Sequence, residues 1–175
     1  IDDPVIFCEH KYLYYHLKAD ALPTEAVPTG KARIARAGRD ATIVTYSAMV
    51  HESLACAEEL AGEGWEVEVI DLRSLRPMDT DTVVASVRKT NRCVTVEEGF
   101  PVGSIGNHIS ATIMERAFDY LDAPVINCTG KDVPMPYAAN LEKLALITPA
   151  EIVAAVKSVC YRCGEVMATQ ILMPA

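Results

Sequence analysis

Short β-branched runs alternate with helical periodicity from about residue 31 onward, and this alternation restricts the possible folds more than any other feature. The runs occupy residues 41–47, 66–72, 93–98 and 124–127. Apolar residues at helical spacing follow the first three runs, over 50–61, 79–90 and 105–117. Strands that are separated by helices pair in parallel through right-handed crossovers. The sequence therefore predicts an α/β fold with helices on both faces of the sheet.

Two further segments complete the predicted architecture. Thr148-Pro-Ala-Glu151 supplies a hydroxyl cap, a proline at the first helical position and a carboxylate that can reach back to the cap, which predicts a last helix. Either Asp79 or Asp81 can cap the second helix. The stretch 31–38 is expected to add an edge strand. We thus expect a three-layer α/β/α sandwich around a mostly parallel five-stranded sheet.

The charge balance argues against nucleic-acid binding. The 175 residues include 24 acidic and 16 basic side chains, which gives a net charge of −8. No basic cluster is larger than a pair such as Arg88-Lys89. No apolar run reaches the ~18 residues of a membrane span, and a signal peptide is missing. We expect a soluble protein of a reducing compartment, without nucleic-acid or membrane partners.

The cysteine pattern does not indicate a metal or redox site. The six cysteines stand at positions 8, 56, 93, 128, 160 and 163. Four of them fall within apolar strand or helix patterns, where a free thiol behaves as a small buried hydrophobe. Cys160-Tyr-Arg-Cys163 has a redox-like spacing, but no second pair accompanies it and it closes a helix, so we interpret it as accidental.

The polar candidates give weak signals for a ligand site. The turn after the first predicted strand carries no G-x-G-x-x-G, and Gly103-Ser-Ile-Gly106 is better explained by close packing of a helix start. His51 and His108 lie near helix starts without a partner at a telling spacing. Glu97-Glu98 ends a strand, where adjacent side chains point to opposite faces, so we expect only one of the two to enter a pocket.

The stretch 121–146 is unusually stiff. Pro134 and Pro136 fix φ and exclude a helix across 132–137, while Gly130 permits a sharp turn. We expect a preset loop that lays Tyr137 and the following leucines against the domain. Stiffness lowers the entropy that is lost when a surface stays in register with a partner, so we interpret the segment as an assembly element.

Asp119 and Asp122 stand at the end of the third main helix, where negative charge opposes the helix dipole. A solvated turn explains them, and so does a surface that receives a basic partner. On the residues alone, both explanations stay open.

Four segments together resemble a known family. They read "VEVIDLRSLRPMDTDTV" (67–83), "EEGFPVGSIGNHI" (97–109), "FDYLDAPV" (118–125) and "GKDVPMPYAANLEKLAL" (130–146). They are similar to the C-terminal, transketolase-type domain of the beta subunits of thiamine-diphosphate-dependent 2-oxo-acid dehydrogenase components. "DVPMPYA" resembles the pyruvate dehydrogenase (acetyl-transferring) branch more than the branched-chain branch.

The resemblance implies a division of the chain into four parts. Residues 1–16 would end a preceding pyrimidine-binding domain as its last strand, and 17–30 would be a linker. Residues 31–162 would form the transketolase C-terminal-like domain. The tail 163–175 resembles the opening of a lipoyl domain. In the family, the terminal carboxylate of the subunit lies near the partner site, so an extension beyond Tyr161 and Arg162 would disturb docking there, and no docking role is carried over to these two residues.

The implied activity is the oxidative decarboxylation of pyruvate, with acetyl transfer to a lipoyl arm. Thiamine diphosphate and Mg would belong to the full enzyme, and the resemblance assigns no catalytic, cofactor-binding or metal-binding residue to this chain. Alone, the chain is expected to be inactive. It would lie in the cytoplasm of a bacterium or in the mitochondrial matrix of a eukaryote.

The implied partners are an alpha subunit, a second beta subunit and the dihydrolipoyl acyltransferase. The basic peripheral subunit-binding domain of the acyltransferase would dock on Asp122, and also on Asp119. Two alternatives remain open, namely a stand-alone, non-catalytic binding module and a beta subunit of another 2-oxo-acid dehydrogenase or transketolase-superfamily enzyme.

Overall fold

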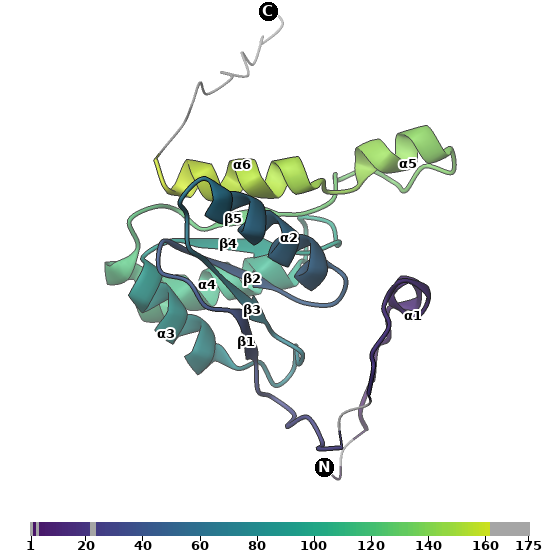
Figure 1. The fold of residues 1–175 in the computed structure, drawn as a ribbon, viewed down its shortest axis with the longest axis horizontal. Coiled ribbons are helices and arrows are strands. Elements are labelled where there is room, and N and C mark those ends of the chain that lie inside the picture. The colour runs from purple at the N-terminus through teal and green to yellow at the C-terminus, as the bar shows by residue number, and fades with distance from the viewer. Residues whose placement is uncertain (1, 3, 22–23, 162–175) are drawn as a thin grey trace, which may run out of the picture.

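A computed structural model, which describes residues 2, 4–21 and 24–161, has a five-stranded sheet at its centre (Figure 1). The strands are β1 (Arg33–Arg36), β2 (Ala41–Thr45), β3 (Val67–Asp71), β4 (Cys93–Val96) and β5 (Ile126–Cys128). Their order in the sheet is β1-β3-β2-β4-β5. Only the edge strand β1 runs antiparallel to its neighbour, while the other pairs are parallel. The predicted fold class is confirmed.

Helices cover both faces of the sheet (Figure 1). Those that pack on it are α2 (Met49–Gly62), α3 (Thr80–Thr90), α4 (Ile105–Ala117) and α6 (Pro149–Val159). Helix α2 packs with α6 on one face, and α3 packs with α4 on the other. The shorter helices are α1 (Lys11–His16), the 3₁₀ turn η1 (Phe118–Tyr120) and α5 (Ala139–Ala145). In Figure 1, α5 lies beyond the sheet, past the N-terminal end of α6.

The strands are apolar on both faces because both faces are covered. Neighbouring residues on β2 illustrate the division: Ile43 belongs to the core under α2 and α6, whereas Val44 belongs to the core under α3 and α4. Val69 and Ile70 divide in the same way on β3. A shift of the strand register by one residue would exchange the two cores, so the register is strongly specified.

A polar seam runs between the sheet and α3. Glu68 on β3 is 1 % exposed. Its carboxylate accepts a hydrogen bond from the Ser86 hydroxyl at 2.5 Å and forms an ion pair with the Lys89 ammonium. The Ser86 hydroxyl also lies 2.6 Å from that of Thr42. Because Ser86 gives its one proton to Glu68, it accepts from Thr42. The buried polar atoms of this seam therefore satisfy one another.

The structure decides between the two candidate caps of α3 in favour of Asp79. Its carboxylate accepts hydrogen bonds from the Thr82 N–H at 3.3 Å, the Thr82 hydroxyl at 2.9 Å and the Ala32 N–H at 3.1 Å. Asp81 instead points outward and pairs with Arg116 at 2.7 Å. The Asp79 side chain thus holds the segment before β1 against the start of α3.

The last helix begins as the sequence predicts. Thr148 accepts a hydrogen bond from the Glu151 N–H, while the Glu151 carboxylate accepts from the Thr148 N–H at 2.9 Å. This reciprocal capping box satisfies two of the N–H groups that a helix start leaves unpaired.

The N-terminal segment differs from the expectation. The last strand of a preceding domain, expected within 1–16, is not formed by the described residues, and α1 occupies Lys11–His16 instead. Ile6 and Phe7 are 90 % and 83 % exposed. A strand needs a neighbour to pair with, and none of the strands formed by the described residues lies beside this segment. The tail 163–175 lies outside the described residues.

Replacing Asp79 with alanine is expected to lower the free energy of unfolding by about 1–2 kcal/mol, because the α3 cap is lost. Burial alone would raise the pKa of Asp79, but the hydrogen bonds from Ala32 and Thr82, with the charge of Lys31, lower this pKa below its usual value. The Asp79 contribution is therefore full above the ordinary, unfolded-state pKa of about 3.9 and is lost as the pH falls through the lower folded-state pKa.

Urea unfolding at pH 7 and at acidic pH measures this effect, with Asp81→Ala as the matched control. That control removes only an exposed ion pair, which is worth less than about 1 kcal/mol. Equal losses for the two variants at pH 7 would contradict the role given to Asp79.

Candidate functional site

The acidic corner, defined here as residues 118–122, is positioned by the ends of α3 and α4. Asn91 ends α3 in a left-handed conformation with φ of 62°, which asparagine tolerates well. The side-chain amide of Asn91 donates to the backbone carbonyl of Tyr120 at 2.7 Å. The backbone carbonyl of Asn91 accepts from the Asp122 N–H at 2.9 Å. The backbone of the corner is therefore held in place by the helix that precedes β4.

The two predicted docking carboxylates have different surroundings. Asp122 Oδ2 lies 3.1 Å from Arg92 Nη2, and Arg92 is held in turn by a hydrogen bond from its Nε to the carbonyl of Val159 at 3.1 Å. The Tyr161 hydroxyl donates to the Asp122 carbonyl. The Asp119 side chain is exposed and makes no hydrogen bond or ion pair with the part of the chain that the structure describes. The unpaired negative charge of the corner is thus that of Asp119.

Basic and apolar groups surround these carboxylates. The guanidinium of Arg88 lies 5.0 Å from the ring centroid of Tyr120, within the range of a cation–π contact, and it donates to the carbonyl of Arg116 at 3.1 Å. Phe118 and Met114 are half-exposed or more. The corner therefore presents charges of both signs around exposed apolar side chains. Arg162, which the resemblance linked to the partner site, lies outside the described residues.

The arm, defined here as residues 131–146, carries the second candidate surface. Its base is closed by a hydrogen bond from the Lys131 N–H to the carbonyl of Ala145 at 2.8 Å, and the Lys131 ammonium contacts Glu151 at the start of α6. Figure 1 shows α5 of this arm reaching past the sheet. Both ends of the arm are therefore fixed, while its middle projects from the domain.

The expected packing of the arm against the domain is wrong. Tyr137 is fully exposed, and Leu141 and Leu144 are 48 % and 71 % exposed. Residues 139–145 form the helix α5, which the sequence analysis did not predict. The helices α2 and α6 pack on the nearby face of the sheet, and the arm does not cover that face.

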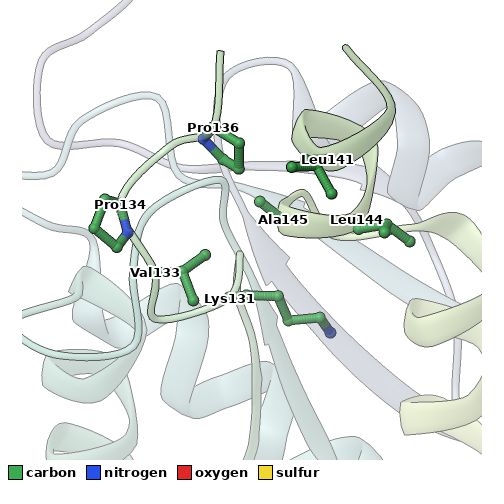
Figure 2. Close-up of a pocket in the computed structure, with 7 residues that line it drawn as sticks. All are labelled: Lys131, Val133, Pro134, Pro136, Leu141, Leu144 and Ala145. Carbon is green, nitrogen blue, oxygen red and sulfur yellow. The ribbon is translucent and has the colours of Figure 1, made fainter. Parts of the chain in front are cut away.

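A groove of about 340 Å³ lies within the arm, between the proline-rich loop and α5 (Figure 2). It is lined by Lys131, Val133, Pro134, Pro136, Leu141, Leu144 and Ala145. Apart from the Lys131 ammonium, its lining side chains are apolar. Such a groove offers contact area to an apolar partner and few groups to orient a small polar ligand.

The strand-end glutamates behave as the alternation of side chains predicts. Glu97 is 2 % exposed, whereas Glu98 is exposed and lies 2.9 Å from the Nε2 of His10. His51 and His108 both stand on exposed helix faces. The prediction that only one of the paired carboxylates enters the interior is confirmed.

The buried Glu97 carboxylate lies at the start of α4. It accepts hydrogen bonds from the Gly106 N–H at 2.9 Å, the Ile105 N–H at 3.3 Å and the Tyr46 hydroxyl at 2.9 Å. Burial, and then the hydrogen bond and charge of Glu97, raise the pKa of Tyr46. The site of Gly106 has no room for a side chain, because a Cβ there would lie 2.7 Å from Glu97 Oε1. This supports the predicted close packing of this helix start.

Three of the four cysteines that the sequence places in apolar patterns, Cys56, Cys93 and Cys128, are buried, but the fourth, Cys8, is not. Cys160, at the end of α6, is buried as well. Burial raises the pKa of Cys56 to about 11 and that of Cys93 to about 12. These thiols therefore stay protonated at neutral pH, and Cys163 lies outside the described residues.

A metal site is not evident in the described part of the chain. Among residues 2, 4–21 and 24–161, no three His, Cys, Asp or Glu side chains are grouped so that they could hold a metal ion. Within the same residues, no helix is long and apolar enough to cross a membrane.

The comparisons with known proteins agree with one another. A family described as "Transketolase, C-terminal domain" matches residues 30–152. The chain is 53% identical over 161 residues to a pyruvate dehydrogenase E1 component subunit beta of Rhizobium meliloti, covering 91% of this chain and 35% of that protein. It is 54% identical to the mitochondrial subunit beta-1 of Arabidopsis thaliana, covering 91% of this chain and 45% of that protein. The chain thus spans between about a third and a half of the curated relatives that it matches.

Solved structures show the same fold. A chain titled "Split gene transketolase, inactive beta4 tetramer" superposes with a TM-score of 0.69 at 30% identity, covering 82% of this chain and 46% of that chain. A 2-oxoglutarate:ferredoxin oxidoreductase from Magnetococcus marinus superposes with a TM-score of 0.50 at 18% identity, covering 74% of this chain and 19% of that one. The second likeness concerns the fold alone.

The exposure of the arm can be tested by comparing the same substitution, leucine to alanine, in the arm and in the core. Leu144→Ala is expected to change the free energy of unfolding by less than about 0.5 kcal/mol, because the side chain contacts mostly water. Leu60→Ala, in the core under α2, is expected to cost about 2–5 kcal/mol. Urea unfolding of the two variants measures both values. A cost above 2 kcal/mol for Leu144→Ala would mean that the arm packs against the domain after all.

Proposed function

The chain belongs to the transketolase C-terminal domain family, and on this premise we propose that it is the C-terminal part of the beta subunit of a thiamine-diphosphate-dependent pyruvate dehydrogenase component. Its contribution would be subunit assembly and docking of the dihydrolipoyl acyltransferase. The observation that carries the proposal is the 53–54% identity to pyruvate dehydrogenase beta subunits over 91% of this chain.

The arm would serve assembly with an alpha subunit and a second beta subunit. Its exposed apolar side chains are held on a fixed base, so little conformational entropy remains to be lost when a partner covers them. Each 100 Å² of apolar surface removed from water stabilises a contact by roughly 2.5 kcal/mol before such losses. The structural relative named as a beta4 tetramer supports a role in self-assembly for this type of chain.

The acidic corner would receive the basic peripheral subunit-binding domain of the acyltransferase. Asp119 presents an unpaired carboxylate, and Asp122 presents one that is shared with Arg92. Exposed charges at the rim of an interface mainly raise the association rate and set specificity. The exposed side chains of Phe118 and Tyr120 would add apolar contact area around these charges.

Thiamine diphosphate and its Mg²⁺ would bind to the full enzyme. The described residues do not fit this cofactor: the turn after β2 has no glycine-rich phosphate loop, and no metal-ligand group is present in the described ranges. We assign no residue of this chain to the cofactor, and we propose that the chain alone does not catalyse decarboxylation.

Combining the chain with the parts that the proposal requires tests the catalytic side of the proposal. The chain joined to an upstream pyrimidine-binding domain, and combined with an alpha subunit, is expected to release CO₂ from pyruvate in the presence of thiamine diphosphate and Mg²⁺. Branched 2-oxo acids serve as the control substrates, and a preference for them would place the chain in another branch of the family. A correctly assembled complex that decarboxylates none of these substrates would refute the catalytic role.

Calorimetry with an isolated peripheral subunit-binding domain tests docking on the acidic corner. Asp119→Ala and Asp122→Ala are each expected to weaken binding about 1.4–5-fold, since exposed ion pairs are worth roughly 0.2–1 kcal/mol. The salt dependence of the affinity should also fall in both variants. Glu52→Ala, which removes an exposed charge from α2, is the control and should bind like the parent. Parent-like affinity and salt dependence in both aspartate variants would remove the proposed role.

A further inference from the structure

The two edges of the sheet differ in how they are protected. The edge strand β1 carries Arg33 and Arg36, and its pairing with β3 shifts in register between Ile34 and Arg36. Charged side chains and bulges at an edge keep further strands from pairing with it. At the other edge, the stretch 124–130 around β5 contains no charged residue, and its pairing with β4 is regular. The edge at β5 therefore lacks both of these devices.

The outward backbone groups of β5 have no partner. On the inward side, the Cys128 carbonyl accepts from the Glu97 N–H at 3.0 Å. Backbone groups alternate in direction along a paired strand, so those of Val125, Asn127 and Thr129 point away from β4. Among the residues that the structure describes, none donates to or accepts from these outward groups. Such a row of free N–H and C=O groups is a template for another strand.

The open run is short and has Asn127 at its centre. The next outward N–H group, that of Lys131, already donates to the Ala145 carbonyl at 2.8 Å. The run thus extends from Val125 to Thr129. An antiparallel copy of the same run, centred on Asn127, would pair Asn127 with its counterpart and Val125 with Thr129. Each copy would then satisfy the outward groups of the other.

The side chains along this edge match those of their own copy. Ile126 and Cys128 pack on the face of the sheet that α6 covers, and in the centred register each opposes the other on the second copy. Asn127 lies on the opposite face, where its side chain bonds to Thr95 and Ser104, and it would oppose a second Asn127. Apolar groups therefore meet apolar groups, and no like charges are opposed along the run.

A hollow of about 410 Å³ gives a second strand access to this edge. The continuous run 126–132 lines one side of it, and Ile147 and Ala155 line the other. Neighbouring side chains on a strand point to opposite faces. Because both Ile126 and Asn127 line the hollow, it follows the edge of β5 and does not lie under one face alone.

We propose that the outer edge of β5 pairs with the same edge of a second copy of this chain, antiparallel and centred on Asn127. The two five-stranded sheets then form one continuous sheet. A two-fold contact of this kind is closed, so pairing stops at two copies. The inference rests on the assembly role proposed above and deepens it, because it assigns the surface that meets the second beta subunit.

Sedimentation equilibrium of the full chain, from about 1 μM to 1 mM, tests the pairing, and the parent is expected to show a monomer–dimer equilibrium in this range. Thr129→Pro removes an outward N–H without loss of a backbone hydrogen bond within the chain. It should weaken the dimer about 10–50-fold, because two hydrogen bonds between the copies are lost. Thr129→Val keeps the N–H group and is the matched control, which should dimerise like the parent.

Two further variants separate the edge from other surfaces. Thr129→Lys keeps the backbone N–H but places a charge at the edge, so it should also weaken the dimer, even if the proline variant does not fold. Leu144→Ser changes the arm and should weaken the dimer less than Thr129→Lys. Circular dichroism shows which variants are folded. Hydrogen exchange gives an independent measurement, since the N–H groups of Asn127 and Thr129 should exchange more slowly in the dimer than after dilution.

Three results would overturn the inference. They are a parent that stays monomeric over the whole range, a Thr129→Val variant as weak as the folded Thr129→Pro or Thr129→Lys variant, and a dimer that only Leu144→Ser weakens. The last result would place the contact on the arm. These outcomes are distinct from the CO₂ assay above, because a chain that pairs through β5 but supports no decarboxylation would refute the catalytic proposal alone.

Discussion

The buried Glu97 carboxylate connects the parts of this fold that the chain places far apart. It follows β4, accepts from the start of α4, and accepts from Tyr46 beyond β2. Parallel strands depend on such ties, because their connections run through whole helices and not through tight turns. A charged group with three donors at one end of the sheet fixes the relative positions of two strands and a helix at once. The two hydrophobic cores can then differ in composition without a change in this geometry.

At the opposite end of the sheet, the seam around Glu68 has a comparable role. Its carboxylate is satisfied by the hydroxyl of Ser86 and by Lys89, whose side chain reaches the surface. Buried polar groups that are fully paired favour one arrangement over its competitors, because each alternative would leave a donor or an acceptor unpaired. The sheet thus has one polar tie at each end, and the apolar strands between them supply most of the free energy of burial.

Around this fixed centre, the arm and the acidic corner are exposed features to which we assign partners. The arm carries leucine, valine and tyrosine side chains into solvent on a base held by Lys131 and Ala145. The acidic corner carries Asp119 and Asp122 among arginines and aromatic rings. Large exposed apolar side chains on a rigid support are typical of interaction surfaces.

The sequence by itself determined the sheet, its helices and the caps at Thr148 and Asp79 or Asp81, because periodicity and capping are properties of neighbouring residues. It also placed Glu97 and Glu98 on opposite sides, since side chains alternate along a strand. Only the tertiary structure decided that Asp79 is the cap, that Tyr137 and Leu144 face solvent, and that Asp122 is paired with Arg92 while Asp119 is not. Each of these depends on which distant segment lies within a few ångströms, and local pattern carries no information about that distance.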